Sequence, residues 1–172
     1  WMSGSVLLVT KEKIDSVFIK YNLYTDQLQV KVDEKEYEFS TDVREFLLPD
    51  PVTGDISLFR SGFIAVPGMN ERSFYKILYD GKTKLLVKHK KLIGSEMTST
   101  PGVKARVFED QKSYFILSAS GKMEKIRKKN KEILDLLEGK TDELKKMIDA
   151  KKMKLASDEE IISLLEYYDS LK

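Results

Sequence analysis

The sequence contains no cysteine and a single histidine, His89. The absence of cysteine excludes disulfides, thiolate catalysis and cysteine-ligated zinc. A Ser-His-Asp triad or a histidine-ligated metal would depend on His89, which lies among lysines in the run Lys88–Lys91. These positive charges disfavour an imidazolium and repel a metal cation. We therefore interpret His89 as structural or solvent-facing, and we predict no catalytic residue, no metal site and no enzymatic activity.

Other chemical signatures are also missing. The glycines are isolated, as turn glycines are, and none begins a phosphate-binding loop of the GxGxxG or GxxxxGK kind. The aspartates in Asp50–Asp55 lack the spacing of a calcium-binding loop. No cofactor is predicted. No apolar run approaches the ~20 residues that a membrane helix needs, so we expect no transmembrane segment in this chain.

The sequence also has little excess of either charge sign. Charged residues make up 34% of the 172 residues, yet the formal net charge is only +2. A nucleic-acid binder needs a clear basic excess, so no nucleic-acid partner is expected. The positive charge gathers in two runs, Lys88–Lys91 and Lys122–Lys131. An apolar fraction of 41% is enough to fill a core, which argues against disorder.

From Ser5 to about Lys125 the chain consists of short runs rich in Val, Ile, Tyr and Phe, broken by turn residues. This pattern predicts consecutive antiparallel hairpins. The clearest hairpin extends from residue 73 to residue 93, and its Asp80-Gly81 pair favours a tight turn with positive φ. The run Phe63–Val66 continues the β character, and residues 94–102 are typical of a loop. A second hairpin is predicted to join residues 114–117 to residues 123–126.

After Ile126 the apolar spacing changes from two residues to about 3.6, which indicates helices. We predict three short helices, the second capped by Thr141 and the third by a capping box of Ser157 and Glu160. Each is too short to be stable alone, so the helices must pack on each other or on the sheet.

The sequence therefore predicts an α+β fold in two parts. Residues 1–126 form an antiparallel β-rich domain built as a meander, with a curved sheet, a sandwich or an open barrel as its form. Residues 127–172 form a short C-terminal helical segment that packs on this domain or projects from it.

Two groups of residues carry a binding signal. The first comprises Arg60, Phe63 and Arg72, which lie near Phe59, Phe74 and Tyr75. Arginine beside aromatic residues is typical of interface hot spots, and aromatic faces also stack on sugars, although core packing is the plainer interpretation. The second comprises Lys125, Arg127, Lys128 and Lys129. These would contact an anionic envelope surface or an acidic partner, although a solvated junction is again the plainer interpretation.

Three stretches resemble a group of exported proteins of Bacteroidota that have no assigned activity. They are Ile19–Leu28, with a YN-[IL]-Y-x-D-x-[LM] pattern, the hairpin Phe74–Val87, and the tail Tyr114–Leu171, which contains KIRKKNKEIL and LLEYYDSL. The resemblance covers most of the chain and supplies no catalytic residues. It implies a precursor with a signal peptide and a periplasmic or envelope-associated mature chain. The start at Trp1 instead of methionine is typical of a processed or excised fragment.

We therefore expect a non-enzymatic cell-envelope protein that binds a protein partner or an envelope component. Two alternatives stay open. A carbohydrate- or lipid-binding module would need aromatic residues exposed on a sheet face or lining a cavity. A glycan or peptide hydrolase would need two carboxylates facing each other in a cleft.

Overall fold

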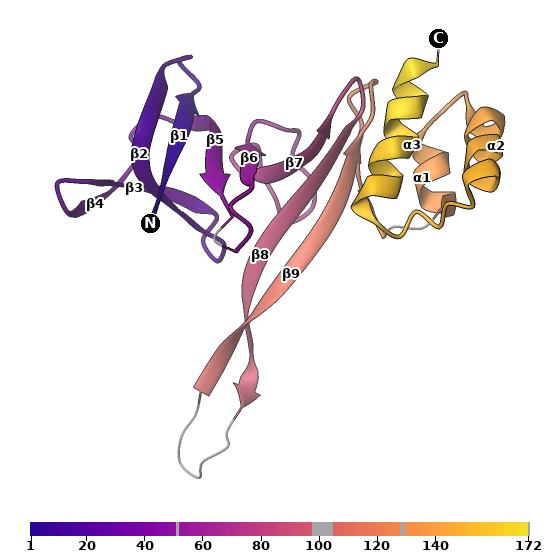
Figure 1. The fold of residues 1–172 in the computed structure, drawn as a ribbon. Coiled ribbons are helices and arrows are strands. Elements are labelled where there is room, and N and C mark those ends of the chain that lie inside the picture. Colours follow the sequence, from indigo (N-terminus) through magenta and orange to yellow (C-terminus); the bar gives the residue numbers. More distant parts are fainter. Residues whose placement is uncertain (51, 98–104, 128–129, 172) are drawn as a thin grey trace. The chain divides into compact units, whose positions relative to one another are not determined.

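The structure, a computed structural model, describes residues 1–50, 52–97, 105–127 and 130–171. It is mostly antiparallel β-sheet followed by three helices, which confirms the predicted α+β class (Figure 1). The strands are β1 Met2–Leu8, β2 Lys13–Asn22, β3 Gln27–Val32, β4 Lys35–Glu38, β5 Val43–Pro49, β6 Ile56–Arg60, β7 Tyr75–Asp80, β8 Lys84–Met97, β9 Ala105–Leu117 and β10 Met123–Ile126. The helices are α1 Asn130–Leu136, α2 Thr141–Lys151 and α3 Asp158–Ser170. Within the described residues, no helix is both long enough and apolar enough to span a membrane.

The chain divides into two compact units, each built from two separate stretches. The first unit comprises Trp1–Ser61 and His89–Lys112, and the second comprises Gly62–Lys88 and Ser113–Lys172. The strands β8 and β9 therefore contribute residues to both units. The sequence predicted a domain boundary after residue 126, where the chain changes from strand to helix. That domain boundary stays a prediction.

In the first unit, six strands pair antiparallel in the order β6-β5-β1-β2-β3-β4. The rings of Tyr21, Phe46 and Phe59 meet in its core, with centroids 5.3 Å apart for Tyr21–Phe46, 4.7 Å for Phe46–Phe59 and 5.4 Å for Tyr21–Phe59. Two strands, β1 and β5, separate β2 from β6 in the sheet. The Tyr21–Phe59 contact therefore requires the sheet to curl, which agrees with the curved form among the three predicted.

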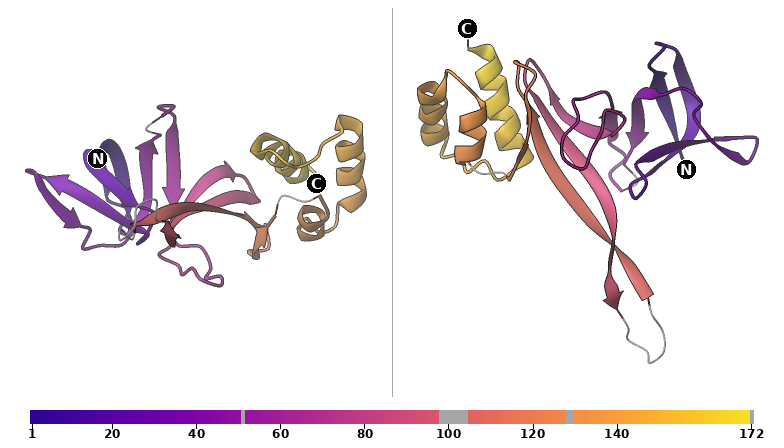
Figure 2. Two further views of the ribbon diagram at one scale, coloured as in Figure 1. Left: turned by 90° about the horizontal axis from the view of Figure 1, so that it is seen from below. Right: turned by 180° about the vertical axis from the view of Figure 1, so that it is seen from behind.

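In the second unit, four strands pair in the order β7-β8-β9-β10, and both of their faces are covered. Neighbouring strand residues point to opposite faces. One face, with Leu85, Ile116 and Ile126, shares a core with the three helices. Figure 2 shows the three helices beside one end of these strands. The other face, with Leu86, Phe115 and Met123, packs against Phe63 and the segment that follows it. The helices thus pack on these strands, which is one of the two arrangements that the sequence left open.

A lysine is part of the second covered face. Lys88 is 1% exposed, and its Nζ donates a hydrogen bond of 2.8 Å to the carbonyl oxygen of Phe74. The same Nζ lies 5.6 Å from the centroid of the Tyr75 ring. A carbonyl acceptor and an aromatic face both attract an ammonium group, and together they offset part of the cost of removing it from water.

The cap of α3 agrees with the sequence pattern. The Ser157 hydroxyl accepts a hydrogen bond of 3.2 Å from the backbone N–H of Glu160. The Glu160 carboxylate reaches back past the cap and accepts from the N–H groups of Ala156 at 3.0 Å and Lys154 at 3.2 Å. These backbone donors, that of Ala156 most strongly, lower the pKa of Glu160. The cap predicted for α2 was wrong, because the helix already begins at Thr141 and its cap position is Lys140.

Three further predictions from local pattern were wrong. The apolar run Phe63–Val66 is not a strand but a loop, in which Val66 forms a bridge with Met69. The start of the predicted loop at Gly94 is instead strand, because β8 continues to Met97. The hairpin of β7 and β8 is present, but Gly81 does not have a positive φ.

Gly4 provides a test of the packing in the first unit. A Cβ on Gly4 would overlap the carbonyl oxygen of Leu47 and lie 2.8 Å from Cδ1 of Ile19. Because a backbone carbonyl cannot move aside, we expect Gly4→Val to lower the free energy of unfolding by about 1–3 kcal/mol or more. Ser3→Val, at the exposed neighbouring position, should change it by less than about 0.5 kcal/mol. Chemical denaturation measures both, and similar losses would contradict the predicted close packing.

Candidate functional site

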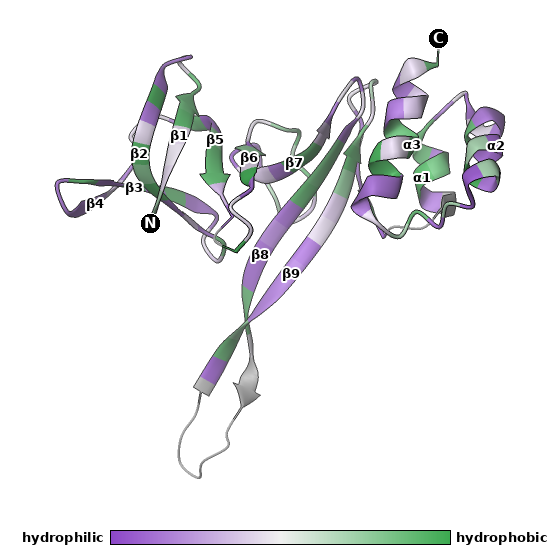
Figure 3. Ribbon diagram, viewed as in Figure 1, coloured by the Kyte–Doolittle hydropathy of each residue, from purple (hydrophilic) through white to green (hydrophobic). Residues whose placement is uncertain are grey.

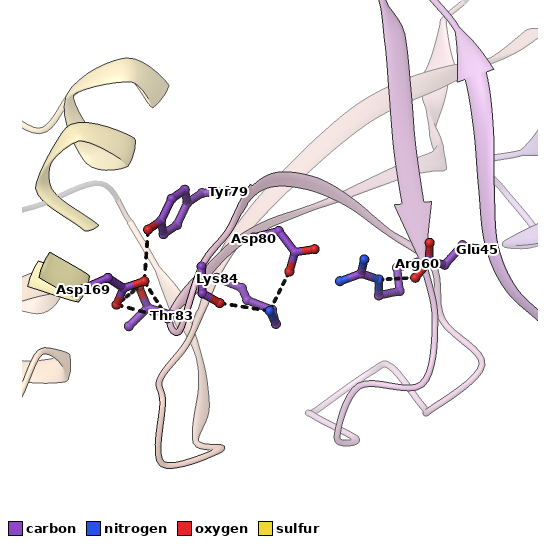
Figure 4. Close-up of polar contacts among 8 residues, drawn as sticks. Glu45, Arg60, Tyr79, Asp80, Thr83, Lys84 and Asp169 are labelled. Carbon is purple, nitrogen blue, oxygen red and sulfur yellow. Dashed lines mark hydrogen bonds and ion pairs between the residues drawn. The ribbon is translucent and has the colours of Figure 1, made fainter. Parts of the chain in front are cut away.

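The predicted residue Arg60 lies in the first unit and forms an ion pair across two strands. Its Nε donates to Oε1 of Glu45 at 2.7 Å, and the two residues face each other in the β5–β6 pair (Figure 4). Both side chains are mostly buried. Cross-strand pairs of opposite charge stabilise a sheet. Arg60 therefore has a structural task here, whether or not it also contacts a partner.

The other two residues of this predicted group lie in the second unit. Phe63 is buried, and its ring meets that of Tyr75 edge-on at 5.6 Å. Arg72 is exposed, and its backbone N–H donates to Oδ1 of Asn70 at 2.9 Å. Contact with a partner by Arg60, Phe63 and Arg72 stays a prediction, and for Phe63 it would require the loop to open. Phe74 and Tyr75 are buried as well, and Phe59 is half-buried in the first unit's ring cluster, so these aromatic rings do not form an exposed stacking surface.

The predicted basic group lies at the end of β10. Lys125 and Arg127 are exposed. Arg127 Nε lies 4.0 Å from a carboxylate oxygen of Glu132, and its backbone N–H donates to the same carboxylate at 3.0 Å. Lys128 and Lys129 lie outside the described residues. Anionic contacts by this group stay a prediction, and Glu132 already offsets part of its positive charge.

An open groove lies between α2 and α3. Its lining residues are Lys146, Met147, Lys151, Ser163, Glu166 and Tyr167. Glu166 is the one carboxylate in this lining, whereas the hydrolase alternative needs two. Over residues 1–50, 52–97, 105–127 and 130–171, no group of three or more His, Cys, Asp or Glu side chains is placed to hold a metal ion.

Asp169 of α3 forms the densest polar cluster of the second unit, at the turn between β7 and β8 (Figure 4). Its carboxylate accepts from the hydroxyl of Tyr79 at 3.0 Å, from the hydroxyl of Thr83 at 3.0 Å, and from the N–H of Thr83 at 3.0 and 3.2 Å. A Cβ on Gly81 would overlap both the Asp169 carboxylate and the Tyr79 hydroxyl, so a larger residue at this position would displace the side chains of the cluster.

This cluster resembles an active site in composition, but its geometry indicates a structural role. Asp169 stands in the last turn of its helix, where the helix dipole disfavours a negative charge. The donors from Tyr79 and Thr83 stabilise the carboxylate there, and they join the helix to the hairpin. Burial, then the hydrogen bond to Asp169, raise the pKa of Tyr79 to about 12.

The feature that sequence reasoning missed is a set of exposed apolar side chains in the first unit. Tyr24, Leu92, Ile93, Val107 and Phe108 are between 43% and 58% exposed, and we call them the hairpin surface. Leu92 and Ile93 are neighbours in β8, and Val107 and Phe108 are neighbours in β9, so each pair points to both faces of the hairpin. Figure 3 shows these strands alternating between hydrophobic and hydrophilic segments along their length. The sequence signal for this surface was a pair of adjacent apolar residues on each side of residues 98–104, Leu92-Ile93 before them and Val107-Phe108 after them.

The hairpin surface contacts the turn between β2 and β3. The Tyr24 and Phe108 rings meet edge-on at 5.6 Å, and the backbone N–H of Lys91 donates to the carbonyl oxygen of Leu23 at 3.0 Å. Every residue from Arg106 to Lys112 is exposed. Large exposed apolar groups of this kind mark interaction sites. The hairpin surface is therefore the best candidate for a functional site in the described chain.

Comparisons of the chain with protein-family models, with curated proteins and with solved structures found no match.

The Asp169 cluster is tested by Asp169→Asn. The change removes the charge and turns one acceptor into a donor that faces other donors, so we expect a loss of roughly 2 kcal/mol in the free energy of unfolding. Asp149→Asn, at an exposed position in α2, is the matched control and should have little effect. Denaturant unfolding of both variants makes the comparison, and an unchanged Asp169→Asn variant would refute a structural role.

The raised pKa of Tyr79 predicts a loss of stability in alkali. The folded chain binds the phenol proton more tightly than the unfolded chain, whose tyrosines titrate near pKa ~10. The contribution of Tyr79 is therefore complete below pH ~10 and is lost as the pH rises toward the folded pKa of about 12. The stability difference between the wild type and Tyr79→Phe should shrink over this pH range. Denaturant titrations at several pH values measure it, and a constant difference would contradict the raised pKa.

Proposed function

We propose that this chain is a non-enzymatic cell-envelope protein that binds a protein partner through the hairpin surface. The observation that carries the proposal is the exposure of Leu92, Ile93, Val107 and Phe108 on both faces of one hairpin. Burial of one such side chain stabilises a contact by about 1.5–3 kcal/mol. Each neighbouring pair places one apolar side chain on each face of the hairpin, and interface energy is concentrated in a few central apolar and aromatic residues of this kind.

The envelope location in this proposal rests on the resemblance of the sequence to exported proteins of Bacteroidota. The basic group, with Lys125 and Arg127 exposed, has a secondary place in the proposal as a contact for anionic envelope components. These two surfaces differ in their dependence on salt. Apolar contacts persist as the salt concentration rises, whereas contacts between exposed charges weaken.

Affinity capture of the tagged chain from a Bacteroidota envelope extract, washed at low and then high salt, tests the proposal. We expect the wild type to retain a protein partner at high salt, and the double variant Leu92→Ser, Phe108→Ser to retain at least tenfold less. Both residues are exposed, so circular dichroism of the variant should match that of the wild type. The matched control is Phe18→Ser, at an equally exposed phenylalanine of β2 in the same unit.

The variant Lys125→Glu, Arg127→Glu addresses the basic group. Compared with the wild type, this variant should fail to capture only those envelope components that the high-salt wash also removes. Equal recovery of the same proteins by the wild type and the hairpin double variant would refute binding through the hairpin surface.

A further inference from the structure

We propose that the partner bound at Phe108, on the β9 side of the hairpin surface, is a second copy of this chain, and that two β9 strands pair edge to edge about Phe108. The inference names the partner for the surface described under the proposed function, and it rests on that proposal. It adds the partner's identity, the strand edge that binds it and the register of the pairing.

The edge of β9 that faces away from β8 is open over most of its length. In the sheet β9 lies between β8 and β10, and β10 pairs only with Tyr114–Leu117. Over residues 105–113, no strand in the described part of the chain pairs with β9 on that side. An open strand edge is a template for another strand, and the added strand's backbone hydrogen bonds provide much of the affinity. The corresponding edge of β8 is contacted by the Leu23 carbonyl at Lys91.

Charged residues on an edge strand usually prevent such pairing, and β9 has several. The order of these charges along β9 favours pairing when two β9 strands meet antiparallel in one register. If two copies pair antiparallel with Phe108 opposite Phe108, Arg106 of each copy lies directly across from Asp110 of the other. Both ion pairs flank the two phenylalanine rings on one face, because alternate residues share a face. Directly opposed pairs of opposite charge and of aromatic rings are both favourable in antiparallel sheets.

The other symmetric registers are less favourable. Pairing about Arg106, Glu109, Asp110 or Lys112 places a charged residue opposite its own copy, which is destabilising. Pairing about Val107 sets Arg106 opposite Phe108 and forms no ion pair within residues 105–113.

Pairing about Gln111 would bring Asp110 opposite Lys112. The same register would carry the second strand onto Tyr114, where β10 is already paired with β9. The register about Phe108 is therefore the one that joins opposite charges on the open part of the edge.

One contact that the pairing would disturb, the ion pair of Lys91 with Asp110, is weak. Within one chain, Lys91 Nζ lies 3.8 Å from Asp110 Oδ1, and these side chains are 43% and 71% exposed. Exposed ion pairs contribute little, so Asp110 can exchange this contact for Arg106 of a second copy at small cost. The Phe108 ring, 58% exposed even beside Tyr24, would be covered in the dimer.

Charge exchange tests the register. Sedimentation equilibrium of the full chain over a range of concentrations should show a monomer–dimer equilibrium. Arg106→Asp and Asp110→Arg should each weaken dimerisation at least tenfold, because each places two like-charged pairs in the interface. The double variant Arg106→Asp, Asp110→Arg restores opposite charges and should return the dissociation constant to within about threefold of the wild type. A dimer that is insensitive to the single changes would overturn the proposed register.

Cross-linking tests the symmetry axis, and the absence of native cysteine makes it direct. Directly opposed residues in an antiparallel pair lie about 4.5–5.5 Å apart at Cα, within the range of a disulfide. Phe108→Cys should therefore form a disulfide-linked dimer under mild oxidation. Val107→Cys points to the other face and lies opposite Glu109, so it should cross-link far less. Equal cross-linking of the two would overturn the register.

The failure of this inference is distinguishable from failure of the proposed function. A chain that stays monomeric at all concentrations, with no cross-link at Phe108→Cys, overturns the second copy as partner. If envelope capture then still recovers a different protein that depends on Leu92 and Phe108, the proposed function stands without the dimer. If that capture also fails, both are refuted.

Discussion

Strands β8 and β9 carry large apolar side chains on both faces, and a ribbon of this kind needs a cover on each face. In the second unit this requirement is met twice, by the helices over Leu85 and Ile116 and by the loop over Leu86 and Phe115. Further along the same strands, in the first unit, the pairs at residues 92–93 and 107–108 are exposed. The apolar pattern is the same in both places, and only the covering differs. This contrast is the physical basis for assigning a binding role to the exposed part.

Much of the fold could be predicted from the sequence, because its signals are local. The alternating run in β2 and β3, the apolar runs on either side of Asp80-Gly81, and the capping residue Ser157 depend on near neighbours in the chain. Where the predictions failed, a tertiary contact decided. The run Phe63–Val66 has strand-like composition, but its apolar side chains cover a sheet face instead of joining the sheet. Local pattern cannot separate these two uses of an apolar run.

The continuation of β8 through Gly94 has a similar explanation. Glycine is unfavourable in strands, so the sequence suggested a loop. In the structure the Glu109 side chain of β9 occupies the space beside Gly94 that a Cβ would need. The hairpin surface was missed because residues 105–113 were not assigned to a strand. The predicted residues Arg60 and Phe63, in contrast, are engaged in an ion pair and a core, which composition alone could not reveal.

The two units are interleaved along the chain, and this affects the order in which they can form during synthesis. The first unit opens the sequence, but it includes His89–Lys112, which the ribosome adds only after residues 62–88 of the second unit. Domains generally fold as units, N-terminal first, as the chain emerges. The first unit is complete only at Lys112, about two thirds of the way along the 172-residue sequence, and the second unit is complete only with the C-terminal helix. Neither unit can be excised as one continuous fragment, so genetic exchange of either would have to replace two segments together.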